Sequence, residues 1–251
     1  PGPPGSALPS PPPLFPCNVE ERDRERMELL VVTVARTISD NNVDGSAHIR
    51  LIADTVQNAP GLVTARFYRS REQNPYYFIL TTWEDEEFWQ KAQERYNPEH
   101  LLLESTHQVL SAPPEQWLMS YLWGYSRPSA QPALAAAHMA TVRLGQTEAL
   151  QRGWIESLRR QAELPTMAIS FLARTPDSHE VQDTEKNSPP SHTNHITARA
   201  TYSAQTITFL NLLSWPSETA REEFYADQQY KALTSYLSRV GVVRIFALEP
   251  V

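Results

Sequence analysis

Cysteine and glycine are scarce in this sequence, and each shortage excludes a class of protein. The single cysteine, Cys17, cannot form a disulfide within the chain, so we expect a reducing, cytoplasmic environment. The eight glycines form no Gly-rich phosphate loop, and no Gly-x-Ser-x-Gly turn occurs. Nucleotide-dependent enzymes and serine hydrolases are therefore excluded.

Positive charge and long apolar runs are also lacking. The formal net charge is −7, whereas binding to a phosphate backbone needs clustered lysine and arginine. No apolar run reaches the roughly 18 residues of a membrane span, and no secretory signal segment is present. The sequence predicts neither a nucleic-acid partner nor membrane insertion.

Proline, in contrast, is abundant at the start of the chain. The first sixteen residues contain eight of the 21 prolines, and proline fixes φ and lacks a backbone N–H. We expect residues 1–26 to form a disordered leader. A proline-rich ligand for a partner domain and material from upstream of the natural start are the alternatives.

The chain contains one pattern twice, a tryptophan that ends an apolar segment and precedes an acidic helix. A true repeat keeps a constant offset except where residues are inserted. Here the offset at the third segment is 25 positions larger than at the first, and the increase lies between the second and third segments. The aligned pairs are Arg36 with Arg143 at 107 positions, Arg69 with Arg174 at 105, and Trp83 with Trp215 at 132.

The repeat predicts two domains, residues 27–126 and 132–251. The additional residues of the second copy fall at 175–198, which are rich in Ser, Pro, Asp, Asn and His. Such a composition favours a flexible loop insertion.

Each copy shows the element order β-α-β-β-α-β, which is typical of ferredoxin-like domains. We therefore predict an α+β fold with two antiparallel sheets. Expected strands are 29–37, 62–69, 76–83 and 116–123, then 134–143, 166–174, 206–215 and 242–248; expected helices are 47–57, 85–95 and 98–109, then 147–162, 217–225 and one ending near 238.

Neither face of the strand at 76–83 is suited to water, because Tyr77, Ile79 and Trp83 alternate with other apolar residues. The natural cover for the second face is the sheet of the other copy. We predict that the sheets pack face to face within one chain, as a pseudo-dimer that functions as a monomer.

These features resemble the dimeric α/β-barrel superfamily, and within it the antibiotic biosynthesis monooxygenase type of domain. The resemblance covers about residues 29–250 and rests on the element order and on two aromatic signatures. It implies a cavity between sheet and helices, in which a phenol, anthrone or quinol of the polyketide type is oxidised by O₂ without flavin or metal. The signatures are Trp83 with Phe88 and Tyr96, and Trp215 to Glu218 with Phe224, Tyr225 and Tyr230.

In the first copy, His100 and His107 lie seven residues apart and are candidate general bases, although half-exposed helix positions would explain them equally. Trp83 is a candidate stacking platform or a core residue. The remaining candidates could bond a substrate oxygen or serve local structure. They are Tyr96 and Asn97 before the second helix, and Arg66 and Tyr68 on the second strand.

In the second copy, His138 lies among small residues on the first strand, which leaves space for a ligand. Asn211 occupies the position of Ile79 and needs a hydrogen-bond partner. Trp215 and Tyr225 keep the aromatic signature, so these four residues are candidates for substrate binding. Since no pair matches His100 and His107, we favour the first copy as the active one.

Two other readings remain open, and a metal site in the loop is not one of them. A haem site is a minority hypothesis, because Ala35 and Arg36 stand where haem-degrading relatives use an asparagine. The loop histidines His179, His192 and His195 lack the fixed backbone that a metal site needs. A non-oxidative cyclase or decarboxylase, or a non-catalytic binding or stress-response barrel, would share the same fold.

Overall fold

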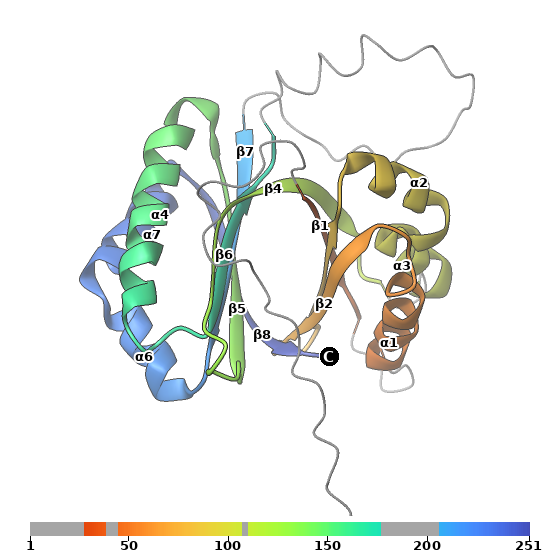
Figure 1. Cartoon of the computed structure of the whole chain (residues 1–251), viewed down its shortest axis with the longest axis horizontal. Helices are drawn as coiled ribbons and strands as arrows, with labels where there is room; N and C mark the ends of the chain where they lie inside the picture. The colour runs from red at the N-terminus through yellow and green to blue at the C-terminus, as the bar shows by residue number, and fades with distance from the viewer. Residues whose placement is uncertain (1–27, 39–44, 107–109, 177–205) are drawn as a thin grey trace, which may run out of the picture.

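Eight strands form a closed barrel with helices on its two outer sides (Figure 1). This computed structural model describes residues 28–38, 45–106, 110–176 and 206–251. The strand order around the barrel is β1-β3-β2-β8-β5-β7-β6-β4. Within the described residues, no helix is both long and apolar enough to cross a membrane.

The first half follows the predicted element order. Its strands and helices are β1 (Leu29–Arg36), α1 (Gly45–Val56), β2 (Leu62–Ser70), β3 (Tyr76–Trp83), α2 (Glu86–Tyr96), α3 (Pro98–Thr106) and β4 (Glu115–Ser126).

The second half repeats that order and adds a short 3-10 helix before its first α-helix. Its elements are β5 (Leu134–Arg143), η1 (Leu144–Gln146), α4 (Thr147–Glu163), β6 (Ile169–Arg174), β7 (Thr206–Trp215), α6 (Glu218–Ala226), α7 (Gln228–Val240) and β8 (Gly241–Pro250). Most of the predicted flexible loop, from residue 177 onward, lies outside the described residues.

The repeated tryptophan signature has a local explanation. Trp83 and Trp215 each end a strand, and the residue two positions later caps the following helix. The side chain of Asp85 accepts a hydrogen bond from the N–H of Phe88, and that of Ser217 accepts one from Ala220. Such caps satisfy N–H groups that the first helical turn leaves unpaired.

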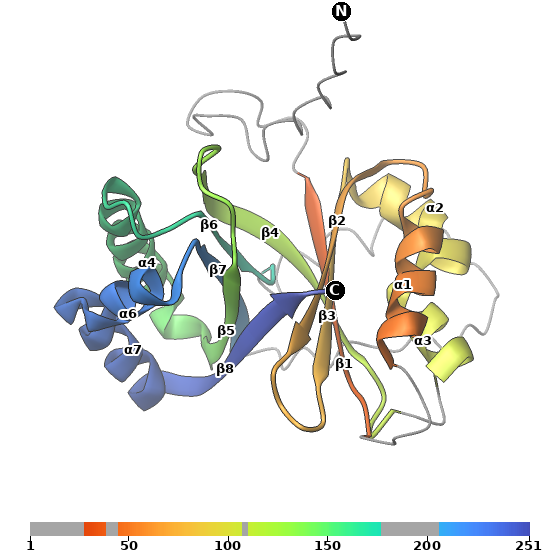
Figure 2. The same cartoon turned by 90° about the horizontal axis from the view of Figure 1, so that it is seen from below.

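The prediction of two facing antiparallel sheets is confirmed. One sheet has the order β4-β1-β3-β2 and the other β6-β7-β5-β8. The two are also joined edge to edge, by pairing of β2 with β8 and of β4 with β6, which the sequence did not predict. Figure 2 shows the same arrangement from below, with a helical layer outside each sheet.

Alternation along the strands explains why both sheet faces are buried. On β3, Phe78 and Leu80 point into the barrel, where they join an apolar cluster that includes Leu210 and Leu212 of β7. The intervening residues Ile79 and Trp83 pack instead against the helices of the first half.

The pairing register revises one sequence alignment. Trp83 lies opposite Leu29, and Trp215 lies opposite Leu134. The first strands of the halves are therefore related by 105 positions, and not by the 107 inferred from Arg36 and Arg143. Thr33 is the single polar residue within the apolar run from Leu29 to Ala35, so little in β1 marks its register, which explains the slip of two residues.

Candidate active site in the second half

The second half buries a histidine between two tyrosines. His138 lies on β5 with Ala136 and Ala140 on the same face, directed at the helices, and is 1% exposed. Its Nε2 is 2.8 Å from the hydroxyl of Tyr225 on α6, and its Nδ1 is 2.9 Å from the hydroxyl of Tyr230 on α7. Both ring nitrogens are thus engaged.

All three groups are neutral near pH 7. Burial lowers the pKa of His138 to about 4, because the charged imidazolium loses its hydration. Burial also raises the pKa of Tyr225 to about 12 and that of Tyr230 well above its usual value. A neutral imidazole has one N–H and one lone pair, so one tyrosine donates a hydrogen bond to His138 and the other accepts one.

A helix cap and one ion pair hold Tyr230 in place. Asp227 caps α7, accepting a hydrogen bond of 2.7 Å from the backbone N–H of Tyr230. The same carboxylate oxygen lies 3.1 Å from the guanidinium of Arg160 on α4. Asp227 therefore ties the start of α7, and with it Tyr230, to the helix on the other side of the site.

Asn211 lies directly opposite His138 in the β5–β7 pair and is fully buried. Its side-chain nitrogen donates to the carbonyl of Phe171 at 2.8 Å and approaches the hydroxyl of Ser170 at 3.3 Å. Its side-chain oxygen has no hydrogen-bond partner among the described residues. The side-chain nitrogen of Asn211 thus has the hydrogen-bond partner that the sequence required, whereas its side-chain oxygen has none among the described residues.

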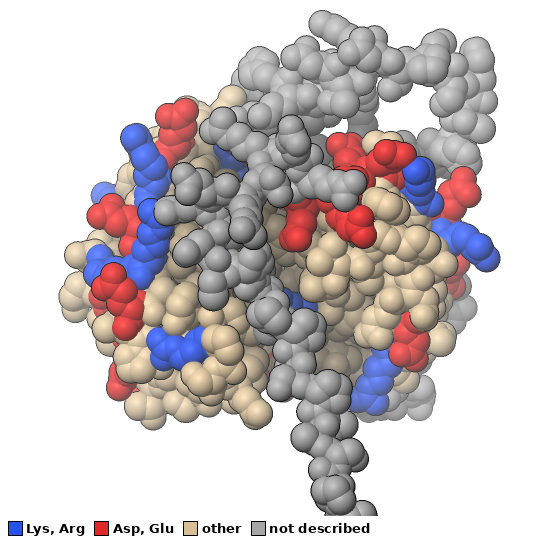
Figure 3. All heavy atoms as spheres, in the orientation of Figure 1, with Lys and Arg blue, Asp and Glu red and all other residues tan. Residues whose placement is uncertain are grey.

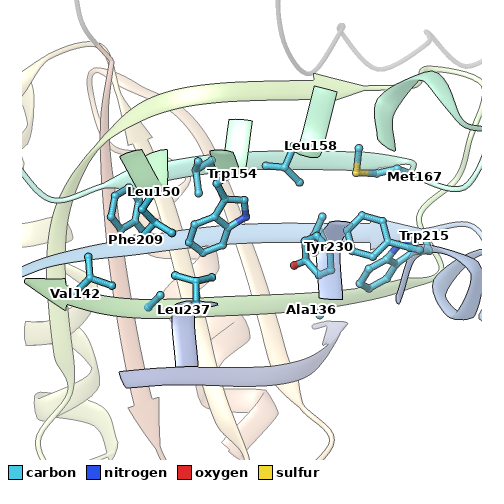
Figure 4. Close-up of a cluster of buried hydrophobic side chains, with 14 of the residues drawn as sticks. Ala136, Val142, Leu150, Trp154, Leu158, Met167, Phe209, Trp215, Tyr230 and Leu237 are labelled. Carbon is cyan, nitrogen blue, oxygen red and sulfur yellow. The ribbon is translucent and has the colours of Figure 1, made fainter. Parts of the chain in front are cut away.

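Helix α4 presents three polar residues on its buried face. Trp154, Ser157 and Gln161 follow the spacing i, i+3, i+7, and the Trp154 ring lies 5.8 Å from that of Phe209 on β7. Because α4 and β7 both run antiparallel to β5, the residues after Trp154 lie farther along β7, toward Asn211. In Figure 4 the indole nitrogen of Trp154 lies on the ring edge nearer Tyr230.

Seven buried polar atoms lack a hydrogen-bond partner within the described part of the chain, and all belong to the second half. Native proteins leave few such atoms, since each costs about 1–3 kcal/mol when unpaired. Their concentration in one half, with Asn211 opposite His138 and Trp215 beside Tyr225, makes this half the candidate for a site that a ligand completes. We call them the polar cluster: Trp154 Nε1, Ser157 Oγ, Gln161 Nε2 and Oε1, Thr166 Oγ1, Asn211 Oδ1 and Trp215 Nε1.

The sequence candidates of the first half do not converge in this way. Trp83 is fully buried against Trp89, and its indole nitrogen donates to the hydroxyl of Thr81 at 3.0 Å. His100 on α3 is exposed, and His107 lies outside the described residues. Trp83 is thus a core residue whose polar atom is already satisfied.

Tyr96 and Asn97 have local structural roles. Tyr96 is half-buried and packs against the cluster that contains Trp83. The side-chain oxygen of Asn97 accepts hydrogen bonds from the N–H of Glu99 at 2.9 Å and from the amide of Gln116 at 2.8 Å. Its oxygen is therefore engaged at the start of α3.

Arg66 and Tyr68 lie on the opposite face of the sheet from Trp83. Arg66 is opposite Leu80 in the β2–β3 pair, and Tyr68 packs against the apolar cluster inside the barrel. Burial raises the pKa of Tyr68, and a hydrogen bond from Arg66 opposes that rise. Alternation along β2 thus separates these two residues from the other first-half candidates.

Sequence reasoning identified four members of the second-half site, named Tyr230 only as part of the aromatic signature, and missed the residues of α4. His138 and Asn211 stood out as polar residues within apolar strands, and Trp215 and Tyr225 as members of the repeated aromatic signature. The residues that α4 contributes look like ordinary polar helix positions. The signal that could have identified them is their spacing on the apolar face of an amphipathic helix.

The chain is similar in fold to solved structures, although no known protein family and no curated protein matches its sequence. A candidate monooxygenase of Fusobacterium nucleatum has a TM-score of 0.61 at 6% identity, over 90% of this chain and 93% of its own. A candidate monooxygenase of Lactobacillus acidophilus has a TM-score of 0.58 at 8% identity, over 89% of this chain and 94% of its own. An anthrone oxidase-like protein has a TM-score of 0.60 at 12% identity, over 90% of this chain and 92% of its own.

These likenesses confirm the dimeric α/β-barrel fold that the sequence predicted, with the whole barrel in one chain. At such identities they show the fold alone. What the chain does must therefore be argued from its own residues.

Proposed function

We propose that this protein is a cofactor-independent monooxygenase that oxidises a phenol, anthrone or quinol of the polyketide type at the second-half site. One observation carries the proposal: His138 is held between two tyrosine hydroxyls beside the polar cluster. The fold shared with candidate monooxygenases and with an anthrone oxidase-like protein supports it.

The reaction needs a proton acceptor and donors for the resulting anion. An anthrone loses a proton from its CH₂ group, and the delocalised anion reduces O₂. One oxygen atom ends in the new ketone and the other in water, so CH₂ and O₂ give C=O and H₂O. The substrate supplies all four electrons. The N–H groups of Trp154, Gln161 and Trp215 are the donors we assign to the developing oxyanion.

A tyrosine, and not His138 itself, meets the substrate, because both imidazole nitrogens are already engaged. With a pKa of about 4, forming the imidazolium at pH 7 would cost about 4 kcal/mol. His138 therefore receives a proton on one nitrogen as it releases one from the other. Buried Tyr230 is the inner end of this relay, and partly exposed Tyr225 is the end that releases the proton.

Haem ligation at this site does not fit the geometry, since neither nitrogen of His138 has a position left for iron. We propose that O₂ is the only co-substrate, and that the chain acts as a monomer in the cytoplasm. A pyridine haemochrome assay of the purified protein tests for bound haem. Light scattering tests whether the chain is a monomer.

The activity is tested with dithranol, a dihydroxylated anthrone, in the purified full-length chain. We expect oxygen uptake and formation of the quinone above the rate of the buffer, unchanged after exhaustive chelation and without added flavin. The Tyr230→Phe variant, which keeps the ring but lacks the hydroxyl, is the matched control for autoxidation. Binding of dithranol without any increase in oxygen uptake would favour the non-catalytic alternative and contradict the proposal.

A further inference from the structure

The second half buries many polar side chains, and none of them is charged. This holds for every buried polar residue in its described segments, and His138 is neutral as shown above. They are His138, Thr147, Ser157, Gln161, Thr166, Ser170, Thr175, Asn211 and Ser214.

The arginines around this layer are engaged elsewhere and are not buried. Arg160 pairs with Asp227, and Arg221 pairs with Glu218 on the surface of α6. Arg127 donates to the carbonyl of Leu164 at 2.7 Å, at the end of α4. On the face seen in Figure 3, charged side chains of both signs lie over the outer helical layers. Arg221 acts electrostatically on Tyr225 at the outer edge of the site, but no arginine of the described segments lies in the buried layer itself.

The polar cluster contains both kinds of hydrogen-bonding atom. Trp154 Nε1, Trp215 Nε1 and Gln161 Nε2 can only donate, whereas Asn211 Oδ1 and Gln161 Oε1 can only accept. A ligand that satisfies them must carry acceptors and at least one hydrogen-bond donor, such as a hydroxyl. A plain hydrocarbon would leave these atoms unpaired, and a ligand with carbonyls alone would leave the two acceptors unpaired.

Aromatic rings surround these atoms. Trp154 lies 5.8 Å from Phe209 between ring centroids, and Trp215 lies 5.4 Å from Tyr225. Such rings favour contact with another flat aromatic system. The rings also exclude water, which makes burial of an unpaired ionic group costly.

From this arrangement we infer that the second-half site selects an uncharged, planar, hydroxylated aromatic ketone or quinone, and discriminates against the same ring system bearing a carboxylate. The inference deepens the proposed function and rests on the same site. Two observations support it: the described buried layer contains no charged side chain, and the polar cluster contains both donors and acceptors.

Equilibrium binding to the full-length protein tests the inference without turnover. The probes are dihydroxyanthraquinone, which is neutral and stable in air, and the same quinone with one added carboxylic acid group. By calorimetry at pH 7, we expect the neutral probe to bind about 100-fold more tightly than the acid, since an unpaired buried carboxylate is strongly unfavourable. Unsubstituted anthraquinone, which has no hydroxyl, should bind about 10-fold more weakly than the dihydroxy compound.

A variant locates the binding. Gln161→Leu removes two atoms of the polar cluster and should weaken the neutral probe about 10-fold, whereas Gln90→Leu on the exposed face of α2 should not change its affinity. Equal affinity for the two quinones, preference for the acid, or binding of neither would overturn the inference.

The failure of the inference and that of the proposed function are distinguishable. Selective binding of the neutral quinone without dithranol oxidation would leave the inference standing and refute the proposed activity. Dithranol oxidation by a protein that binds both quinones equally would do the reverse.

Discussion

The two halves of the barrel place polar groups at the same point of the fold and satisfy them differently. Thr33 and His138 occupy matching positions, because Thr33 lies opposite Ile79 and His138 lies opposite Asn211. In the first half, the amide nitrogen of Gln116 donates to the hydroxyl of Thr33 at 2.9 Å and to the side chain of Asn97 at 2.8 Å.

The first-half group is thus closed by its own hydrogen bonds, whereas the second-half group leaves several atoms unpaired. No buried polar side-chain atom of the first half lacks a partner, within the segments described for it. The comparison teaches that the same backbone can carry a self-sufficient core in one copy and, in the other, a core with unpaired polar atoms, which we propose that a ligand completes.

The largest expected effect comes from moving the asparagine into the first half. Ile79→Asn should lower the free energy of unfolding by about 4 kcal/mol, because an amide would replace apolar contacts in a core that offers it no partner. The reciprocal Asn211→Ile should cost less than about 1.5 kcal/mol, since it also removes an unpaired carbonyl. Urea denaturation measures both, and equal losses would contradict the distinction between the halves.

The pH dependence of stability should report the second half. His138 has a folded pKa of about 4, below its ordinary value of 6.5, so between these pH values the unfolded chain binds a proton that the folded chain does not. Stability should fall by about 3 kcal/mol as the pH decreases from 6.5 to 4. The His138→Phe variant should lack this loss in its own plot of unfolding free energy against pH. If the variant loses as much stability as the unmodified protein, His138 is not the group responsible.

Activity should depend on one histidine and not on the other. His138→Ala should lower dithranol turnover by about 100-fold or more, the usual contribution of a positioned proton acceptor. His100→Ala, in exposed α3, should retain the rate of the unmodified chain within a factor of two. Steady-state oxygen uptake gives both rates. The opposite result would move the active site to the first half, as the sequence alone had favoured.

The smallest difference concerns the two matching tryptophans. Trp83→Phe breaks a hydrogen bond of 3.0 Å to Thr81 and should cost about 1 kcal/mol more stability than Trp215→Phe, whose indole nitrogen has no partner in the described chain. Only Trp215→Phe should weaken binding of dihydroxyanthraquinone. Thermal unfolding and calorimetry measure the two effects, and a binding loss in Trp83→Phe would break the comparison.

The sequence predicted the order of elements correctly, and strands 76–83, 134–143 and 206–215 to the residue. Alternation and strand-ending tryptophans are local signals, which the chain carries wherever its partner lies. The pairing of β2 with β8 and of β4 with β6 joins segments far apart in sequence, and no local pattern specifies it. For that reason the closure of the barrel had to be seen in the structure.

The site was predicted in part for a similar reason. His138 and Asn211 were recognisable because a polar residue inside an apolar strand needs an explanation. Whether His100 faces the sheet or solvent depends on how α3 lies against the sheet. Gln161 did not stand out, because it is one of many polar residues on its helix. Burial of these side chains is a tertiary property, so the sequence alone could not decide which half carries the site.

The pairing that closes the barrel within one chain has a consequence for how such a protein can change. In a barrel built from two identical subunits, every substitution is present twice and must be tolerated in both places. Here Ile79 and Asn211 are separate codons at matching positions, so one copy can hold an apolar core while the other acquires polar atoms that weaken it. Covalent fusion thus frees one half to stabilise the barrel and the other to specialise.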